Sequence, residues 1–344
     1  MIMSEQSAKS ILRAVYLLII VVILNMILNF YYHISSVPSK EATEVQKAYW
    51  KPRSISQDLP PGDEGELILY GHKLIIATAE TIGPLAVDEE LRYSGNGLDC
   101  NNCHLDAGRK IGSGPFIGVT NRYPQFRGRE NRQGSIADRI NGCMERSMNG
   151  KALPEDSQEM QALVAYMTWL SKNVPEEVEA LYKGYTAIDL PSFKADTVIG
   201  KVLYREKCMH CHMERGKGLK KKGKSFAGYI YPPLGGNDTY NDGAGMNRVI
   251  TAAEFIKSNM PFGATYDAPR VSDVEAYHIA AYINTFQRPE KTDKNSDYPD
   301  MMLKPVSTPY GPWADDFSPE QHKFGPFPPI IAFYKKTYDL EKSK

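Results

Sequence analysis

Two copies of one five-residue pattern, Cys-x-x-Cys-His, constrain this sequence of 344 residues more than any other feature. They occupy residues 100–104 and 208–212. Two thiols at this spacing can add across the two vinyl groups of one haem, and the histidine that follows then reaches the iron. The motifs therefore predict two c-type haems. Their predicted binding residues are Cys100, Cys103 and His104 for the first haem and Cys208, Cys211 and His212 for the second.

Paired cysteines have two other common uses, a zinc site and a thiol redox pair. The cysteine pairs of a zinc ribbon usually stand about 15–20 residues apart, whereas these two pairs are about a hundred residues apart. A thioredoxin-like pair belongs to a βαβ setting, and strand-like alternation of apolar residues is scarce along this chain. The sequence therefore favours covalent haem at both motifs.

The arrangement of predicted helices around each motif is also repeated. In both copies a short helix precedes the motif, and Gly- and Pro-rich loops and a longer helix follow it. The predicted helices cover residues 66–80, 157–171, 196–206 and 271–286. This pattern is typical of class I cytochrome c, so we expect an all-α protein with two such domains. Their expected boundaries are residues 63–180 and 190–290.

The N-terminus carries an apolar run of nineteen residues, 14–32, preceded by Lys9 and Arg13. Its length and the flanking positive charges predict a transmembrane helix that leaves the rest of the chain on the outer side. We therefore expect a membrane anchor over residues 1–33 and a polar tether over residues 34–62. The alternative is a cleaved signal peptide, which would leave a soluble exported protein.

The last segment, residues 291–344, is rich in proline and aromatic residues. Disordered tails are poor in aromatic residues, so we expect this segment to cover the domains in an extended form. Residues 217–224 (KGLKKKGK) are basic, which fits either a solvated loop or a docking site for an acidic partner. The whole chain has 41 basic and 41 acidic residues, and this balance gives no support to nucleic-acid binding.

Each iron also needs a further ligand or an open position. In the class I fold this ligand comes from a loop some tens of residues after the motif, and it is most often a methionine. For the second haem the candidates are Met246 and Met260, and we expect Met260, which stands just before a proline. Ordinary core packing is the alternative role for any single methionine.

The first domain offers an unusual candidate ligand, Cys143, which lies 39 residues after His104. Met144, Met148 and Met160 are also available, and a lone cysteine is most often a small buried hydrophobe. Basic residues crowd the sequence around it: Arg122, Arg127, Arg129, Arg132, Arg139, Arg146 and Lys151. Positive charge favours the thiolate, the form that binds metal and attacks sulfur. We therefore predict a reactive Cys143 and a small sulfur-containing anion as substrate.

Several stretches resemble the dihaem thiosulfate dehydrogenases, over roughly residues 65 to 330. They are NGLDCNNCHLDA, DRINGCMERSMNGKAL, NDGAGMNRVITAAEFIKSNMPFG and DYPDMMLKPVSTPYGPWADDFSPEQHKFGPF. The resemblance implies that His104 and Cys143 bind the catalytic first haem, and that His212 and Met260 bind the second. The substrate-site residues that it implies are Arg129, Arg139, Ser147 and Lys151. Some relatives have a lysine directly before this methionine, whereas this chain has Asn259.

The resemblance also implies an activity, namely oxidation of two thiosulfates to tetrathionate with transfer of two electrons through the haems. The same site could reduce tetrathionate, and the sequence leaves the preferred direction open. A c-type cytochrome or a terminal oxidase is the expected acceptor, on the periplasmic side of the bacterial inner membrane. The alternatives are a non-catalytic dihaem electron carrier and a dihaem peroxidase, and the basic setting of Cys143 argues against both.

Overall fold

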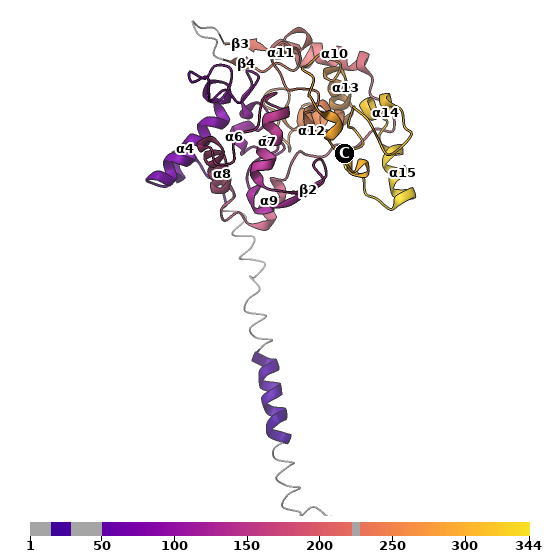
Figure 1. Cartoon of the computed structure of the whole chain (residues 1–344). Coiled ribbons are helices and arrows are strands. Elements are labelled where there is room, and N and C mark those ends of the chain that lie inside the picture. Colours follow the sequence, from indigo (N-terminus) through magenta and orange to yellow (C-terminus); the bar gives the residue numbers. More distant parts are fainter. Residues whose placement is uncertain (1–14, 29–49, 222–227) are drawn as a thin grey trace, which may run out of the picture. The chain divides into compact units, whose positions relative to one another are not determined.

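The computed structural model describes residues 15–28, 50–221 and 228–344. The chain forms two units, Met1–Lys51 and Pro52–Lys344, and the second contains both Cys-x-x-Cys-His motifs. The two haem-binding regions therefore pack into one body (Figure 1). Most of the predicted tether and residues 222–224 of the basic run lie outside the described residues. The predicted boundary between the two cytochrome domains stays a prediction.

The region around the first motif is mainly helical. Its helices are α3 (Ile55–Asp58), α4 (Asp63–Ile76), α5 (Thr78–Thr81), η1 (Cys100–Asn102), α6 (Leu105–Gly108), η2 (Thr120–Arg122), α7 (Ile136–Arg146), α8 (Gln158–Ser171) and α9 (Glu176–Leu181). Strands β1 (Gln125–Arg127) and β2 (Arg132–Gly134) form an antiparallel hairpin just before α7. Arg129 lies in the turn of this hairpin.

The region around the second motif repeats this composition. Its elements are α10 (Thr197–Lys207), α11 (Met209–His212), η3 (Glu214–Gly216), β3 (Leu219–Lys220), β4 (Tyr229–Tyr231), η4 (Gly245–Asn247), α12 (Val249–Asn259) and α13 (Asp273–Ile283). Strands β3 and β4 pair antiparallel, and both sheets of the described chain have only two strands. The expectation of an essentially helical pair of cytochrome domains therefore holds for the described residues.

A close helix crossing is common to both regions. In the first, α4 packs on α8, and a Cβ at Gly71 would lie 2.1 Å from the backbone oxygen of Ala162. In the second, α10 packs on α13, and a Cβ at Gly200 would lie 2.0 Å from the backbone oxygen of His278. Glycine is the only residue without a Cβ, so it allows each helix preceding a motif to touch the long helix that follows it. The repeat seen in the sequence thus extends to the packing.

The C-terminal segment contributes to the core of the second region. Its elements are η5 (Lys294–Ser296), η6 (Met301–Leu303), α14 (Pro319–Phe324) and α15 (Pro328–Tyr338). Phe327, Ile330 and Tyr334 are buried in one cluster with apolar residues of α10, α12 and α13. Figure 1 shows α14 and α15 in yellow, beside the helices of the second region. The segment is therefore an integral part of the fold.

The prediction of an extended C-terminal segment is wrong for α14 and α15. Pro319 and Pro328 stand at the first position of these helices. The amide of a first-turn residue has no partner within the helix, so proline begins a helix there at little cost. The Ser318 side chain caps the start of α14 by accepting a hydrogen bond from the amide of Gln321. Two of the prolines that suggested an extended chain, Pro319 and Pro328, are therefore helix starts.

The prediction of a transmembrane helix is corrected by the structure. Among the described residues, no helix is both long and apolar enough to cross a membrane. The described helix in the predicted span covers residues 15–28. The remaining residues of the predicted span lie outside the described residues.

We expect Gly200→Ala to destabilise the second region. The new methyl group would overlap the backbone oxygen of His278. Overpacking of this kind lowers the free energy of unfolding by about 1–3 kcal/mol. The higher helix propensity of alanine offsets less than about 1 kcal/mol of this loss. Urea unfolding of the holoprotein measures the change. Lys201→Ala, on the exposed side of the same helix, is the control and should leave stability nearly unchanged. Equal free energies of unfolding for the two variants would contradict the close packing of α10 on α13 at Gly200.

Candidate active site

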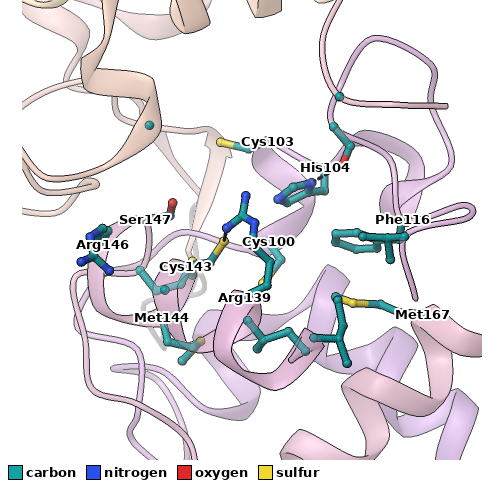
Figure 2. A pocket seen from close by; sticks show the side chains of 18 of the residues that line it. Cys100, Cys103, His104, Phe116, Arg139, Cys143, Met144, Arg146, Ser147 and Met167 are labelled. Carbon is teal, nitrogen blue, oxygen red and sulfur yellow. Dashed lines mark hydrogen bonds between the residues drawn. The ribbon is translucent and has the colours of Figure 1, made fainter. Parts of the chain in front are cut away.

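The first motif opens into a cavity of about 530 Å³, within the usual range for small-molecule sites. Both thiols of the motif, His104 and Cys143 all line it. Figure 2 shows these side chains converging from separate segments of the first region. The remaining lining includes an apolar set: Leu74, Ile75, Ile82, Leu98, Phe116, Ile140, Met144, Met148, Leu163 and Met167. The cavity is therefore apolar where a porphyrin would lie and polar around Cys143.

Local hydrogen bonds fix the first motif at the edge of this cavity. Asp99 and Asn102 form a capping box around the turn η1, and the Cys100 amide donates to the Thr78 hydroxyl at 3.0 Å. The Nδ1 atom of His104 lies 2.6 Å from the backbone oxygen of Gly114. A carbonyl oxygen can only accept, so Nδ1 carries the proton and Nε2 is left as the metal-binding atom.

Cys143 faces His104 from helix α7. The helix begins at a capping box formed by Ser135 and Asp138, which sets its start one residue after the β-hairpin. Cys143 lies near His104, whose imidazole helps to lower the pKa of this thiol, and its Sγ accepts a hydrogen bond from Nη1 of Arg139 at 3.0 Å. Arg139 and Cys143 are four residues apart and so lie on one face of the helix. The two ligands predicted for the first iron thus lie opposite each other.

The cysteines of the cavity fall into two electrostatic classes. Burial raises the pKa of Cys100 and of Cys103 to about 12, which keeps both thiols neutral. Burial also raises the pKa of Cys143, but the charge of Arg139, its hydrogen bond to the sulfur and the nearby imidazole of His104 outweigh burial and lower this pKa to about 6. At neutral pH, Cys143 is therefore a thiolate. This difference separates two thiols that can be alkylated by a haem from one that can bind iron or attack sulfur.

The residues present fit a c-type haem. Two neutral thiols, a histidine with a defined tautomer and an apolar cavity are what covalent haem attachment requires. In the described part of the chain, no group of three or more His, Cys, Asp or Glu side chains could hold a metal ion by itself. The protein side chains alone therefore do not form the zinc site considered as an alternative.

Positive charge is concentrated around Cys143, although the chain as a whole is neutral. Six arginines line the cavity: Arg122, Arg127, Arg129, Arg139, Arg146 and Arg248. Two of them are balanced locally, since Arg122 pairs with Glu179 at 2.9 Å and Arg127 pairs with Glu130 at 2.8 Å. The others carry most of the positive charge that an anion in the cavity would meet.

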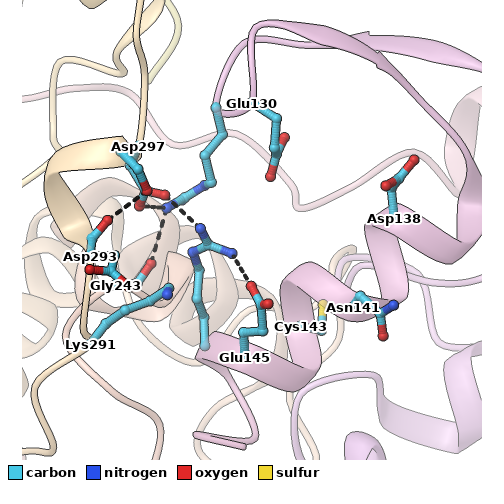
Figure 3. Close-up of polar contacts among 12 residues, drawn as sticks. Glu130, Asp138, Asn141, Cys143, Glu145, Gly243, Lys291, Asp293 and Asp297 are labelled. Atoms are coloured by element: carbon cyan, nitrogen blue, oxygen red, sulfur yellow. Dashed lines mark hydrogen bonds and ion pairs between the residues drawn. The ribbon is translucent and has the colours of Figure 1, made fainter. Parts of the chain in front are cut away.

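Asp297, from the C-terminal segment, binds two of these arginines (Figure 3). Its carboxylate accepts from Arg129 at 2.6 Å and from Arg146 at 2.5 Å, and from the hydroxyl of Tyr310 at 2.7 Å. The Asp297 side chain is only 3% exposed. Burial alone raises its pKa, but the two arginines lower the pKa below the ordinary value of an aspartate. The carboxylate therefore stays ionised and holds Arg129 and Arg146 in place.

The other predicted substrate-site residues differ in position. Ser147 lines the cavity at the end of α7. Lys151 is exposed, is not among the lining residues, and its ammonium group lies 4.9 Å from the ring centre of Tyr93. The structure thus brings Arg129, Arg139 and Ser147 to the cavity and leaves Lys151 outside it.

The second motif ends in the short helix α11. His212 is buried, and its Nδ1 atom lies 2.9 Å from the backbone oxygen of Pro232, which again leaves Nε2 as the metal-binding atom. Met260 packs against the apolar cluster of the second region, as Cys208 does. Met246 instead lines the cavity of the first motif. The two candidate methionines therefore lie in different regions of the structure.

Asn259, directly before Met260, joins the two regions. It is 2% exposed, and its Nδ2 atom donates to the backbone oxygen of Gly112 at 2.8 Å and to that of Phe255 at 3.0 Å. Gly112 belongs to the loop that also supplies the partner of His104. The Asn259 side chain thus connects the segment that contains Met260 with the loop that holds the ring of His104.

Three cavity or cavity-supporting residues were missed by reasoning from the sequence. They are Tyr185, in the connection between the two regions, Arg248, at the start of α12, and Asp297. They lie far along the chain from Cys143, and only tertiary packing brings them near it. The arginines of α7 could be predicted as site residues because they are close to Cys143 in the sequence itself.

The fold and the site define a class: a dihaem c-type cytochrome with a thiolate in a basic cavity at its first haem. Comparison with known proteins agrees. Residues 92–175 match the SoxA/TsdA cytochrome c domain, and residues 198–287 match the cytochrome c domain. Each match contains one Cys-x-x-Cys-His motif, which confirms the prediction of two covalently bound haems.

Several similar proteins share one activity. The chain is 38% identical over 256 residues to the thiosulfate dehydrogenase of Stutzerimonas stutzeri, a match covering 74% of this chain and 78% of that protein. It is also 38% identical over 236 residues to the enzyme of Allochromatium vinosum, covering 67% and 82% of the two chains. The solved thiosulfate dehydrogenase TsdBA of Marichromatium purpuratum, in its as-isolated form, superposes with a TM-score of 0.63 at 34% identity. That match covers 71% of this chain and 50% of the other.

This chain belongs to the thiosulfate dehydrogenase family. The resemblance inferred from the sequence is thereby confirmed, and so is the enzyme class, an oxidoreductase that oxidises thiosulfate and transfers the electrons through c-type haems. The non-catalytic electron carrier is not favoured.

We expect Asp297→Asn to lower the free energy of unfolding by about 3–5 kcal/mol, because it removes the buried carboxylate shared by Arg129 and Arg146 and leaves Arg146 only its longer contact with Glu145 at 3.4 Å. The pKa of Asp297 is lowered in the folded protein, so its stabilising effect is present above about pH 4 and is lost as the pH falls below that. Urea unfolding between about pH 3 and pH 7 measures this. The exposed pair of Glu89 and Arg92 supplies the control, Glu89→Gln, expected to cost under about 1 kcal/mol. A similar decrease in the free energy of unfolding in both variants would contradict the stabilising pairing of Asp297 with Arg129 and Arg146.

Proposed function

We propose that this enzyme oxidises thiosulfate through a covalent adduct of Cys143. The observation that carries the proposal is the setting of this thiol: it lines the cavity with His104, accepts a hydrogen bond from Arg139, and has a pKa lowered to about 6. A thiolate is the form of cysteine that attacks sulfur, and a guanidinium beside it also attracts the anionic substrate. Bound in this cavity, haem would supply a one-electron acceptor, and the second haem another.

The chemistry balances in two steps. In the first, the Cys143 thiolate and the outer sulfur of one thiosulfate form a sulfur–sulfur bond, and two electrons leave. In the second, the outer sulfur of another thiosulfate attacks the sulfur that is bonded to Sγ. The bond to Sγ breaks, the thiolate of Cys143 is restored, and tetrathionate leaves. No proton is needed in either step, so the site requires cations and a thiolate in place of a general base.

Arg139, Arg129 and Ser147 are the residues that we assign to the sulfonate group of the first thiosulfate. All three line the cavity with Cys143. Arg139 also holds the thiolate, so it must share its donors between the sulfur and the substrate. Only the family resemblance supports Lys151 as a fourth substrate-binding residue. Run in reverse, the same two steps reduce tetrathionate.

For the second haem we propose His212 and Met260 as the two iron ligands. The packing of Met260 with the cluster that Cys208 contacts supports this choice over Met246. A neutral thioether favours ferrous iron more than an anionic thiolate does, so the second haem should have the higher reduction potential. Electrons would then pass from the first region to the second and out to an acceptor. A periplasmic c-type cytochrome or a terminal oxidase suits this role.

We expect Cys143→Ala to abolish turnover in both directions. Alanine is a good helix former, so α7 should persist, and both haems should stay attached because attachment depends on the two motifs. The absorption spectrum of the first haem should change, since a ligand is lost. Arg139→Ala should be milder and raise the thiosulfate KM by roughly ten- to a hundredfold. An active Cys143→Ala enzyme with an unchanged spectrum would overturn both roles of this cysteine.

We expect Met260→Gly to abolish the weak sulfur-to-iron absorption band near the red end of the oxidised spectrum. Met246→Gly should leave this band intact, because Met246 lines the cavity of the first motif. Both variants are measured as purified holoprotein with two attached haems. Loss of the band in Met246→Gly, with retention in Met260→Gly, would reverse the assignment.

A further inference from the structure

We propose that Arg248 binds the sulfonate of the second thiosulfate, the one that attacks the Cys143 adduct. This inference rests on the proposed function and deepens it. It assigns a separate anion subsite to a residue of the second cytochrome region, so the catalytic cavity is completed by both regions.

The position of Arg248 supports this role. It stands at the N-cap of α12, in the second region, and lines the cavity that contains Cys143 and Arg139. Its Nε atom is buried and has no hydrogen-bond partner. Its Nη1 atom donates to the backbone oxygen of Lys344 at 3.3 Å. A buried guanidinium N–H without an acceptor is costly, and an anion in the cavity would supply the missing acceptor.

Charge pairing distinguishes Arg248 from the other cavity arginines. Arg122, Arg127, Arg129 and Arg146 each pair with a carboxylate, and Arg139 bonds to the sulfur of Cys143. Within the described residues, Arg248 has no ion pair with an Asp or Glu side chain. Burial and the nearby charge of Arg129 lower the pKa of Arg248. The carboxylate of Glu254 is near enough for the charge of Arg248 to lower its pKa, but the two side chains form no ion pair. The buried Nε donor of Arg248 is therefore available to a ligand.

The reaction requires such a charge. The second thiosulfate carries two negative charges and must approach an adduct whose sulfonate is already negative. Two anions at close range in a cavity repel each other strongly unless each has its own cation. Arg139 serves the thiolate and, with Arg129, the first sulfonate, whereas Arg146 is paired with Asp297. A second sulfonate therefore needs a further cation, and Arg248 is placed to provide it.

The test is a pair of measurements on purified holoenzyme with Arg248→Gln. In steady state, the thiosulfate KM should rise by roughly ten- to a hundredfold, the loss expected for one charge-assisted contact. During turnover, intact-protein mass should show a thiosulfate adduct on Cys143 accumulating in the variant and scarce in the wild type, because only the second step is slowed. One equivalent of thiosulfate without acceptor should still reduce the haems at the wild-type rate. Arg248→Lys should recover part of the loss.

Arg288→Gln is the matched control. Arg288 is also a half-buried arginine of the second region with an unpartnered nitrogen, but it lies over the Tyr240 ring and is not a lining residue. It should leave KM and adduct level unchanged. If Arg248→Gln resembles the wild type, or if it slows haem reduction without accumulating the adduct, the second subsite is wrong. If the wild type without acceptor forms no Cys143 adduct at all, the proposed function itself fails.

Discussion

The competition between burial and positive charge at Cys143 governs this site. Burial disfavours the thiolate, yet one guanidinium at 3.0 Å and the imidazole of His104 are enough to lower its pKa to about 6. The two motif cysteines, in the same cavity without such a partner, keep a pKa near 12. One helical spacing, from Arg139 to Cys143, thus decides which cysteine is reactive. The rest of the structure holds this helix and supplies the cations around it.

The first haem site is not the product of the first cytochrome region alone. Asp297 reaches it from the C-terminal segment and holds Arg129 and Arg146. Asn259, which directly precedes Met260, donates to Gly112 in the loop that supplies the hydrogen-bond partner of His104. Arg248 enters the cavity from α12. The residues that we assign to the substrate and the proposed ligands of both haems are therefore supported by the same contacts between the two regions, which belong to one compact unit.

Much of this architecture could be predicted from short-range patterns. The two motifs identify six haem-binding residues, and the lone Cys143 stands among arginines within one sequence segment. Asp297, Arg248 and Tyr185 could not be found in this way, because no local pattern ties them to α7. The C-terminal prolines were misinterpreted because the same residue both extends a chain and begins a helix. The transmembrane prediction used the length of an apolar run, whereas no helix of the described residues is long and apolar enough to cross a membrane.

Electron paramagnetic resonance of the fully oxidised holoenzyme tests the central claim most directly. That claim is that the Cys143 thiolate and His104 bind the same iron. A thiolate and a histidine on one ferric haem give a low-spin spectrum with a narrow spread of g-values, unlike that of a histidine–methionine haem. The account predicts one haem of each kind per molecule, with the narrow spectrum lost in Cys143→Ala. Two histidine–methionine spectra in the wild type, unchanged by that substitution, would contradict it.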